Sequence, residues 1–197
     1  AENTKYIRAA AASGPTMMFA HIGKRNIISM LGGTTIALVL ISLIMIVALR
    51  SFKLGMTSMV PNLVPAAMGF GVWGMLVGEV GLALSVVTSM TLGIVVDDTV
   101  HYMSKYQRAR VEKGYDPEQA VRYAFTSVGR ALLVTSVVLI AGFLVLAFSS
   151  FKLYSGMGLL TALVIALALL ADFLLLPTLL MKIEENSNEK STTATTA

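Results

Sequence analysis

Charged side chains are scarce in this sequence, and cysteine is absent. Asp, Glu, Lys and Arg make up 13% of the 197 residues, whereas about 25% is usual for a soluble domain. The absence of cysteine excludes disulfide bonds and thiolate metal sites. The two histidines, His21 and His101, are too few and too far apart in the sequence to suggest a metal site. We therefore expect neither a metal nor any other cofactor.

The sequence also lacks the motifs of common enzymes. It contains no nucleophile elbow, no P-loop and no HExxH motif, so we do not expect an enzyme. The formal net charge is +4, but the basic residues stand between apolar stretches, where such residues set membrane topology. The expected partner is therefore the lipid bilayer and not nucleic acid.

Apolar residues dominate what remains. They make up 56% of the chain, and the mean hydropathy is +0.77. A water-soluble fold of this size could not bury so much apolar surface. Long apolar runs cross the hydrocarbon core as helices, because only a helix pairs all the backbone groups within one segment. The sequence thus predicts an all-α membrane protein with a bundle of about five transmembrane helices. The predicted spans are 27–49, 56–77, 80–103, 128–148 and 153–181.

The regions outside these spans carry further predictions. The polar tail 184–197 is rich in Thr, Asn and Ser, and we expect it to be disordered. The chain starts at Ala1 without the pattern of a signal peptide, which suggests a piece of a longer protein. In the polar loop before the fourth span, Asp116 resembles a helix N-cap and Pro117 a first helical residue. The apolar residues that follow recur at helical spacing, which predicts a short amphipathic helix on the cytoplasmic membrane surface.

Basic residues indicate the orientation of the bundle. The loop before the fourth span is rich in Lys and Arg, and such loops stay on the cytoplasmic side. This places the C-terminus, after Lys182, in the cytoplasm and the N-terminus outside it. Lys24 and Arg25 oppose this assignment, because they would lie on the outer side.

Two adjacent acids inside the third span are the main functional signal. Asp97 and Asp98 lie about seven residues, or roughly 10 Å, from the inner end of the span at Lys105. A carboxylate at that depth is costly unless it is paired, hydrated or protonated, and two neighbouring carboxylates resist ionising together. A group that gains and loses a proton in this way suits a proton relay.

Four further residues are candidate partners of this pair. His101 follows Asp97 by four residues on the same helix face, where it could relay a proton or only donate a hydrogen bond. Thr135 and Ser136 lie at a matching depth in the fourth span, although hydroxyls in membrane helices usually bond their own backbone. Asp172 in the fifth span could join the relay, or it could cap a neighbouring helix or contact a bend near Pro177.

Several motifs resemble one known superfamily. Residues 93–101, GIVVDDTVH, resemble the signature of the tenth transmembrane helix of resistance–nodulation–division (RND) exporters, especially the MMPL-like and hopanoid-exporter-like branch. Residues 127–136, SVGRALLVTS, resemble the start of helix eleven, and residues 148–151, FSSF, resemble its outer end. Residues 171–177, ADFLLLP, resemble helix twelve.

The resemblance implies a fold and a function. It places the chain as helices eight to twelve of a twelve-helix exporter, with 1–25 as the end of an extracytoplasmic domain or linker and 26–183 as the bundle. It implies a bacterial inner membrane, exchange of protons for lipids or other amphiphilic compounds, an N-terminal membrane half as partner, and a homo-oligomer. Asp97 and Asp98 would be the relay residues and Thr135 a supporting position. The helix-four acids expected in the other half are missing from this chain.

Two other functions remain open on the sequence alone. A sensor or scaffold with the sterol-sensing version of this bundle would bind lipid and change shape without moving protons, and it would tolerate loss of the acid pair. A channel is less favoured, because the sequence has no repeated pore motif and no ring-forming polar stripe.

Overall fold

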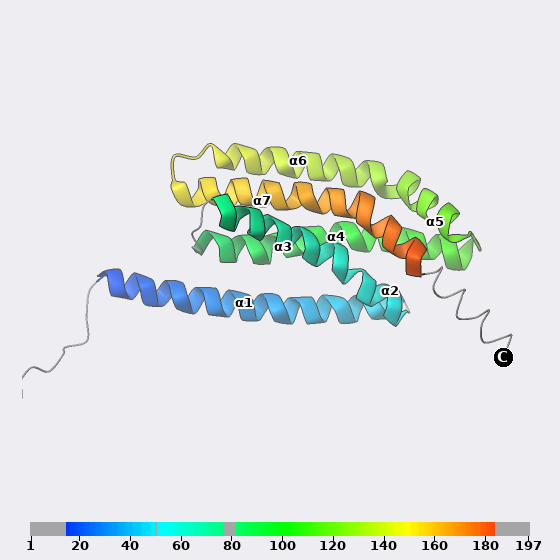
Figure 1. Ribbon diagram of the computed structural model, residues 1–197, viewed down its shortest axis with the longest axis horizontal. Helices are drawn as coiled ribbons and strands as arrows, with labels where there is room; N and C mark the ends of the chain where they lie inside the picture. The colour runs from blue at the N-terminus through cyan, green and yellow to red at the C-terminus, as the bar shows by residue number, and fades with distance from the viewer. Residues whose placement is uncertain (1–14, 50, 77–81, 184–197) are drawn as a thin grey trace, which may run out of the picture.

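The computed structural model describes residues 15–49, 51–76 and 82–183, and within these ranges the chain is helical with no β-strand (Figure 1). Two short segments, η2 and η3, have the wider π-helical turn, and each continues directly from an α-helix. The all-α prediction is therefore confirmed. The elements are α1 (Pro15–Ala48), α2 (Phe52–Thr57), α3 (Met59–Leu76), α4 (Leu82–Glu112), α5 (Pro117–Ala124), η2 (Phe125–Gly129), α6 (Arg130–Ala147), α7 (Lys152–Leu170) and η3 (Ala171–Leu175).

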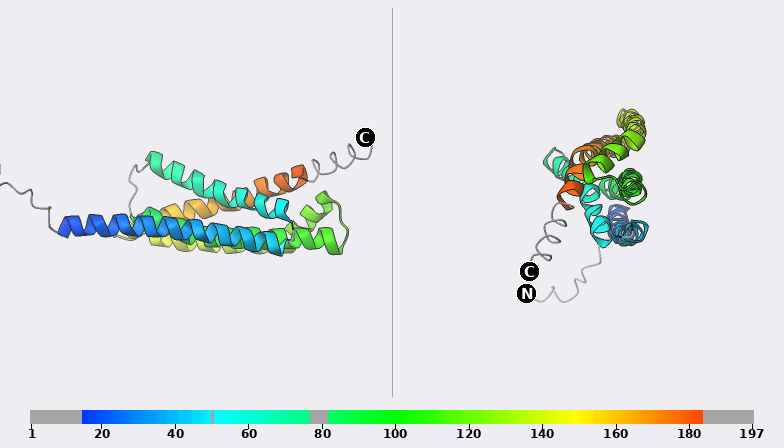
Figure 2. Two further views of the ribbon diagram at one scale, coloured as in Figure 1. Left: turned by 90° about the horizontal axis from the view of Figure 1, so that it is seen from below. Right: turned by 90° about the vertical axis from the view of Figure 1, so that its right-hand side faces the viewer.

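The long helices lie side by side in one elongated bundle (Figures 1 and 2). Helix α7 is central, since it packs against α3, α4 and α6. Helix α1 lies at the edge, where it packs on α4 and α2 and leaves most of its surface exposed. Successive long helices run in opposite directions, so the turn after α1 and the loop between α4 and α5 lie at the same end.

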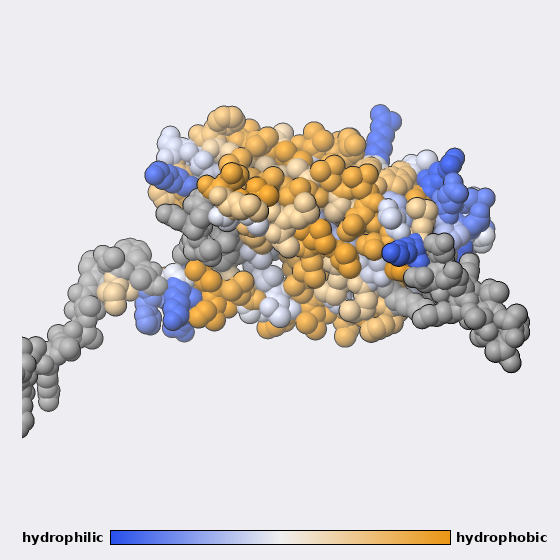
Figure 3. Space-filling model, in the orientation of Figure 1, coloured by the Kyte–Doolittle hydropathy of each residue, from blue (hydrophilic) through white to orange (hydrophobic). Residues whose placement is uncertain are grey.

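The surface of the bundle fits a lipid bilayer. Four described helices are long and apolar enough to cross a membrane: His21–Val47, Leu54–Leu76, Pro117–Ala147 and Lys152–Ile183. Apolar residues cover the middle of the face shown in Figure 3, and hydrophilic residues gather at its two ends. Helix α4 differs, because its C-terminal third is polar, but it lies within the bundle against α1, α3 and α7.

The helices extend beyond the apolar spans predicted for them. Helix α1 begins at Pro15 instead of residue 27, so residues 15–25, expected to close an extracytoplasmic domain or linker, continue directly into the first span. Helix α4 continues past Met103 to Glu112. Hydropathy marks the thickness of the lipid core, whereas a helix continues into water as long as no residue breaks it. The predicted disordered tail, 184–197, lies outside the described residues.

The segment predicted as a short amphipathic helix is helical and packs against α4. Helix α5 does begin at Pro117, but the Asp116 side chain makes no capping hydrogen bond. Ala120 and Ala124 are fully buried in a core cluster with Tyr106 of α4. The chain then passes through η2 into α6 without a break. The apolar face of α5 therefore lies against the C-terminal part of α4.

Helices α6 and α7 approach so closely that one position requires glycine. A Cβ atom on Gly158 would lie 2.6 Å from the Phe143 carbonyl oxygen and 2.7 Å from the Ala147 nitrogen. These are backbone atoms of α6, so they cannot swing aside as a side chain would. Close backbone contact of this kind holds membrane helices together where lipid provides no hydrophobic drive.

We expect Gly158→Ala to destabilise the protein by about 1–3 kcal/mol, because the new methyl group forces α6 and α7 apart. Gly142→Ala on α6 is the matched control, since a Cβ atom there meets nothing within 4 Å. Thermal unfolding of the detergent-purified protein measures the difference. Equal melting temperatures for the two variants would contradict the close approach.

Candidate functional site

A groove of about 860 Å³ lies between α4 and the η2–α6 segment and contains the acid pair. Asp97, Asp98 and His101 line it from α4, and Thr135 lines it from α6. Gly93 contributes to its opening, because no atom lies where its side chain would be. The structure thus brings Asp97, Asp98, His101 and Thr135 to one groove, whereas Asp172 does not line it. The remaining lining residues are Ile94, Val128, Ala131, Leu132, Val134, Val138 and Leu139.

Asp98 connects the two walls of the groove. The Ser136 hydroxyl of α6 donates a hydrogen bond of 3.2 Å to the Asp98 Oδ2. Ser136 is fully buried, whereas Asp98 is partly exposed to the groove. A change in the charge of Asp98 would therefore change a bond that holds α4 to α6.

Asp97 and His101 form the second contact in the groove. The His101 Nε2 lies 3.5 Å from the Asp97 Oδ1, one helical turn away, and the two side chains are 62% and 71% exposed. An exposed pair of this kind contributes little stability. Both side chains are also open to the groove.

Ser136, and not Thr135, makes the contact with Asp98. The Thr135 hydroxyl donates back to carbonyl oxygens of its own helix, Ala131 and Leu132, each at 3.0 Å. The two residues are neighbours in sequence, but consecutive side chains on a helix point about 100° apart. Both residues lie at the depth of the acids in the sequence, and depth alone does not distinguish them.

Asp172 lies outside the groove, in η3, where it contacts the side of α4 that faces α3 and η3. It is 3% exposed and does not line the groove. The Thr99 hydroxyl lies 3.0 Å from the Asp172 Oδ1 and 2.7 Å from the Asn62 Oδ1 of α3. Asn62 was missed in the sequence analysis. Asn62 is an amide inside the predicted span 56–77. A buried polar group is costly unless it has a hydrogen-bond partner, so the same cost that marks the acids in the sequence also marks Asn62.

Asp172 belongs to the π-helical segment η3. The Leu176 N–H donates to the Ala171 carbonyl five residues earlier, which is the π pattern. The next residue, Pro177, has no N–H and cannot restore the α-helical pattern. Wide turns of this type are rare and often occur at functional sites.

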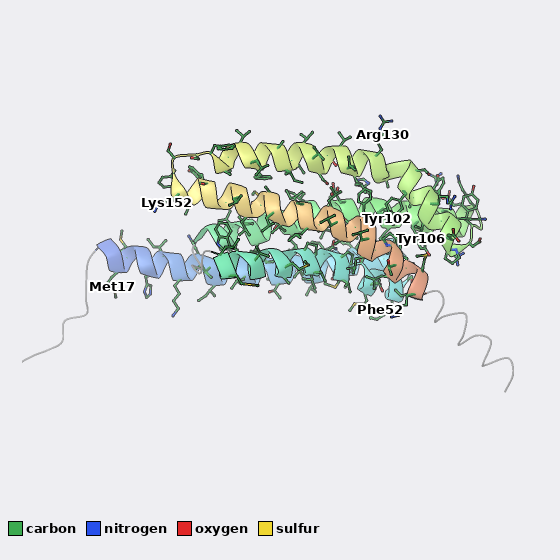
Figure 4. The ribbon with its side chains drawn as sticks, turned by 45° about the horizontal axis from the view of Figure 1, so that its top comes forward. Met17, Phe52, Tyr102, Tyr106, Arg130 and Lys152 are labelled. Atoms are coloured by element: carbon green, nitrogen blue, oxygen red, sulfur yellow. The ribbon has the colours of Figure 1, made fainter. Side chains whose placement is uncertain are left out.

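Among the described residues, no Lys or Arg pairs with Asp98 or Asp172. Arg108 pairs with Glu112, and Arg122 pairs with Glu118, both near the end of the bundle where α4 meets α5. Arg130 is exposed and points away from the bundle (Figure 4). The part of the chain that the structure describes also has no group of three His, Asp or Glu side chains that could hold a metal ion.

Comparison with known proteins identifies the family of the chain. The sequence profile of the MMPL family matches residues 6–193. The chain is also 28% identical over 152 residues to a protein of Methanocaldococcus jannaschii named "Putative membrane protein MJ1562". That match covers 77% of this chain but 39% of the relative, so the chain spans well under half of the length of the relative. Because the family profile extends over nearly the whole sequence, the chain belongs to the MMPL family of membrane proteins.

Proposed function

We propose that the chain is a membrane half of an exporter driven by the proton gradient, which moves lipids or other amphiphilic compounds. The observation that carries the proposal is the adjacent pair Asp97 and Asp98, which line one groove between two membrane helices, α4 and α6. Membership of the MMPL family supports a transporter-like role. We do not propose an enzymatic reaction.

The proposed coupling depends on the charge of Asp98. When Asp98 is charged, it is a strong acceptor for the Ser136 hydroxyl, and α4 and α6 are held together at this depth. When a proton neutralises it, that bond weakens and the helices can repack. Asp97 and His101, exposed at the same groove, would pass the proton to and from Asp98. A transporter cycle needs two such packings, each favoured by one protonation state.

We further propose that the α4–α5 end of the bundle is cytoplasmic, in an inner membrane. Positively charged residues gather at that end, and such residues favour the cytoplasm. This would place the N-terminus outside and the C-terminus inside. The elements that meet at this end carry Lys53, Lys105, Arg108, Arg110, Lys113, Arg122 and Lys182, whereas Lys24, Arg25 and Lys152 belong to the opposite ends of α1 and α7.

The proposed partners are a second membrane half and further copies of the protein. The matched relative is more than twice as long as the region it shares with this chain. The groove with its two acids opens outward from the described helices, where a further set of helices could cover it. Protons and a hydrophobic or lipid-like substrate complete the proposed set of partners.

We expect the double variant Asp97→Asn, Asp98→Asn to reduce proton flux at least tenfold, because neither amide can carry a proton between the two sides. Flux is measured with a pH-sensitive dye inside liposomes that contain the full-length protein. Asp116→Asn is the control, since this exposed acid lies in the loop before α5. Equal flux in wild type and double variant would remove the proton relay and favour a lipid sensor or scaffold.

We expect Ser136→Ala to lower the flux by about threefold to tenfold, because a lost hydrogen bond to a carboxylate is worth about 1 kcal/mol or more. Thr135→Val is the matched control. It removes a hydroxyl from the same groove, but that hydroxyl bonds only its own helix in the structure. The same loss of flux in both variants would show that the Ser136–Asp98 contact has no special role.

A further inference from the structure

The polar cluster on the protein-facing side of α4 is separate from the groove. Asn62, Thr99 and Asp172 come from α3, α4 and η3, and each is at most 3% exposed. We propose that Asp172, positioned by Thr99 and Asn62, is a second proton-binding site of the bundle and holds its proton in the packing seen here. The inference goes beyond the proposed relay and does not require Asp97 or Asp98 to carry protons.

Each close contact of the cluster has one donor and one acceptor only when Asp172 is protonated. The Thr99 hydroxyl has one hydrogen, but it lies within reach of three acceptors: the Asn62 Oδ1 at 2.7 Å, the Asp172 Oδ1 at 3.0 Å and the Val95 carbonyl at 3.3 Å. If Thr99 donates to Asn62, its contact with a charged Asp172 would place two acceptors together. A proton on the Asp172 Oδ1 completes a chain in which Asp172 donates to Thr99 and Thr99 donates to Asn62.

Among the residues that the structure describes, no cation lies beside Asp172 to compensate a negative charge. Helix α3 presents no titratable side chain, and α4 presents only Asp98 and Tyr102 as titratable groups that interact with Asp172. No Lys or Arg of the described helices pairs with it. A buried carboxylate without a cation is costly, so a neutral carboxyl is the form that fits.

A different hydrogen bond can form when Asp172 loses its proton. The Asp172 Oδ2 is buried and has no hydrogen-bond partner, and the same is true of the Tyr102 hydroxyl. The two groups interact electrostatically across the interface between α4 and η3. A charged Asp172 would attract the Tyr102 hydroxyl as a donor, and forming that bond would satisfy both orphaned atoms.

Tyr102 connects this site to the groove. Its ring packs edge-on against Phe125 of η2 at 5.2 Å, and Phe125 packs against Phe173 of η3 at the same distance. A movement of Tyr102 toward Asp172 would therefore disturb both π-helical segments. Because η2 leads directly into α6, the disturbance would reach the helix that forms the opposite wall of the groove.

Infrared spectroscopy of the full-length protein at neutral pH, in a detergent that contains no carbonyl group, tests the proposal. A protonated buried carboxyl group gives a C=O band that a carboxylate lacks. We expect this band in wild type and in Asp97→Asn, Asp98→Asn, and its loss in Asp172→Asn, which mimics the neutral acid and should fold. A spectrum of Asp172→Asn that equals the wild-type spectrum in this region, or no band in wild type, would overturn the proposal.

The positioning role of Thr99 has a matched control in Thr161. Both are fully buried threonines, but the Thr161 hydroxyl has no hydrogen-bond partner. We expect Thr99→Val to shift the Asp172 band, and Thr161→Val to leave it in place. Equal spectra for these two variants would overturn the positioning role.

Two alternative states of the cluster give different spectra, and either one would overturn the proton site. An Asn62 amide that presents its NH₂ group to Thr99 would let Thr99 donate to a charged Asp172, and wild type would then lack the band. A band that disappears when sodium chloride replaces choline chloride would show a cation site in place of a proton site. Because none of these spectra depends on transport, a failed flux assay and a failed proton site remain distinguishable.

Discussion

Hydrocarbon offers no hydrogen-bond partner, so every polar group in a membrane span must find one within the protein. Most hydroxyls in this bundle find it within their own helix. Thr35, Ser42, Thr91 and Thr178 each donate to the carbonyl four residues earlier. The side chains that form hydrogen bonds between helices therefore identify the places where polar contacts, in addition to packing, hold the bundle together. Ser136 with Asp98, and Thr99 with Asn62 and Asp172, are such places.

Helix α4 carries both of these sites on consecutive residues. Asp98 faces the groove beside α6, and Thr99 faces α3 and η3. The rotation of about 100° between neighbours on a helix separates them into two environments, one open and one buried. Glycine complements this arrangement on α7, where Gly158 lets the α6 backbone come close. The bundle therefore combines rigid packing at one end with polar contacts nearer the other.

The sequence predicted the broad plan because that plan depends on composition. Apolar length predicts membrane helices, and the cost of a buried charge marks Asp97, Asp98 and Asp172. Helix ends were missed, because lipid thickness and helix length are different quantities. The choice of Ser136 over Thr135 depends on how α6 is rotated about its own axis, which only packing against α4 decides. Asn62 was overlooked since an amide carries no charge.

The π-helical turn at Ala171–Leu175 has a mechanical consequence of its own. A wide turn holds one more residue than an α-helical turn, and it can migrate along a helix by exchanging hydrogen bonds one at a time. Each such step would swivel the intervening side chains by about 100° while leaving the helix intact at both ends. Asp172 lies in this turn, directly after α7. One such step would therefore turn its side chain from one neighbour to another, while the helix on either side keeps its position in the membrane.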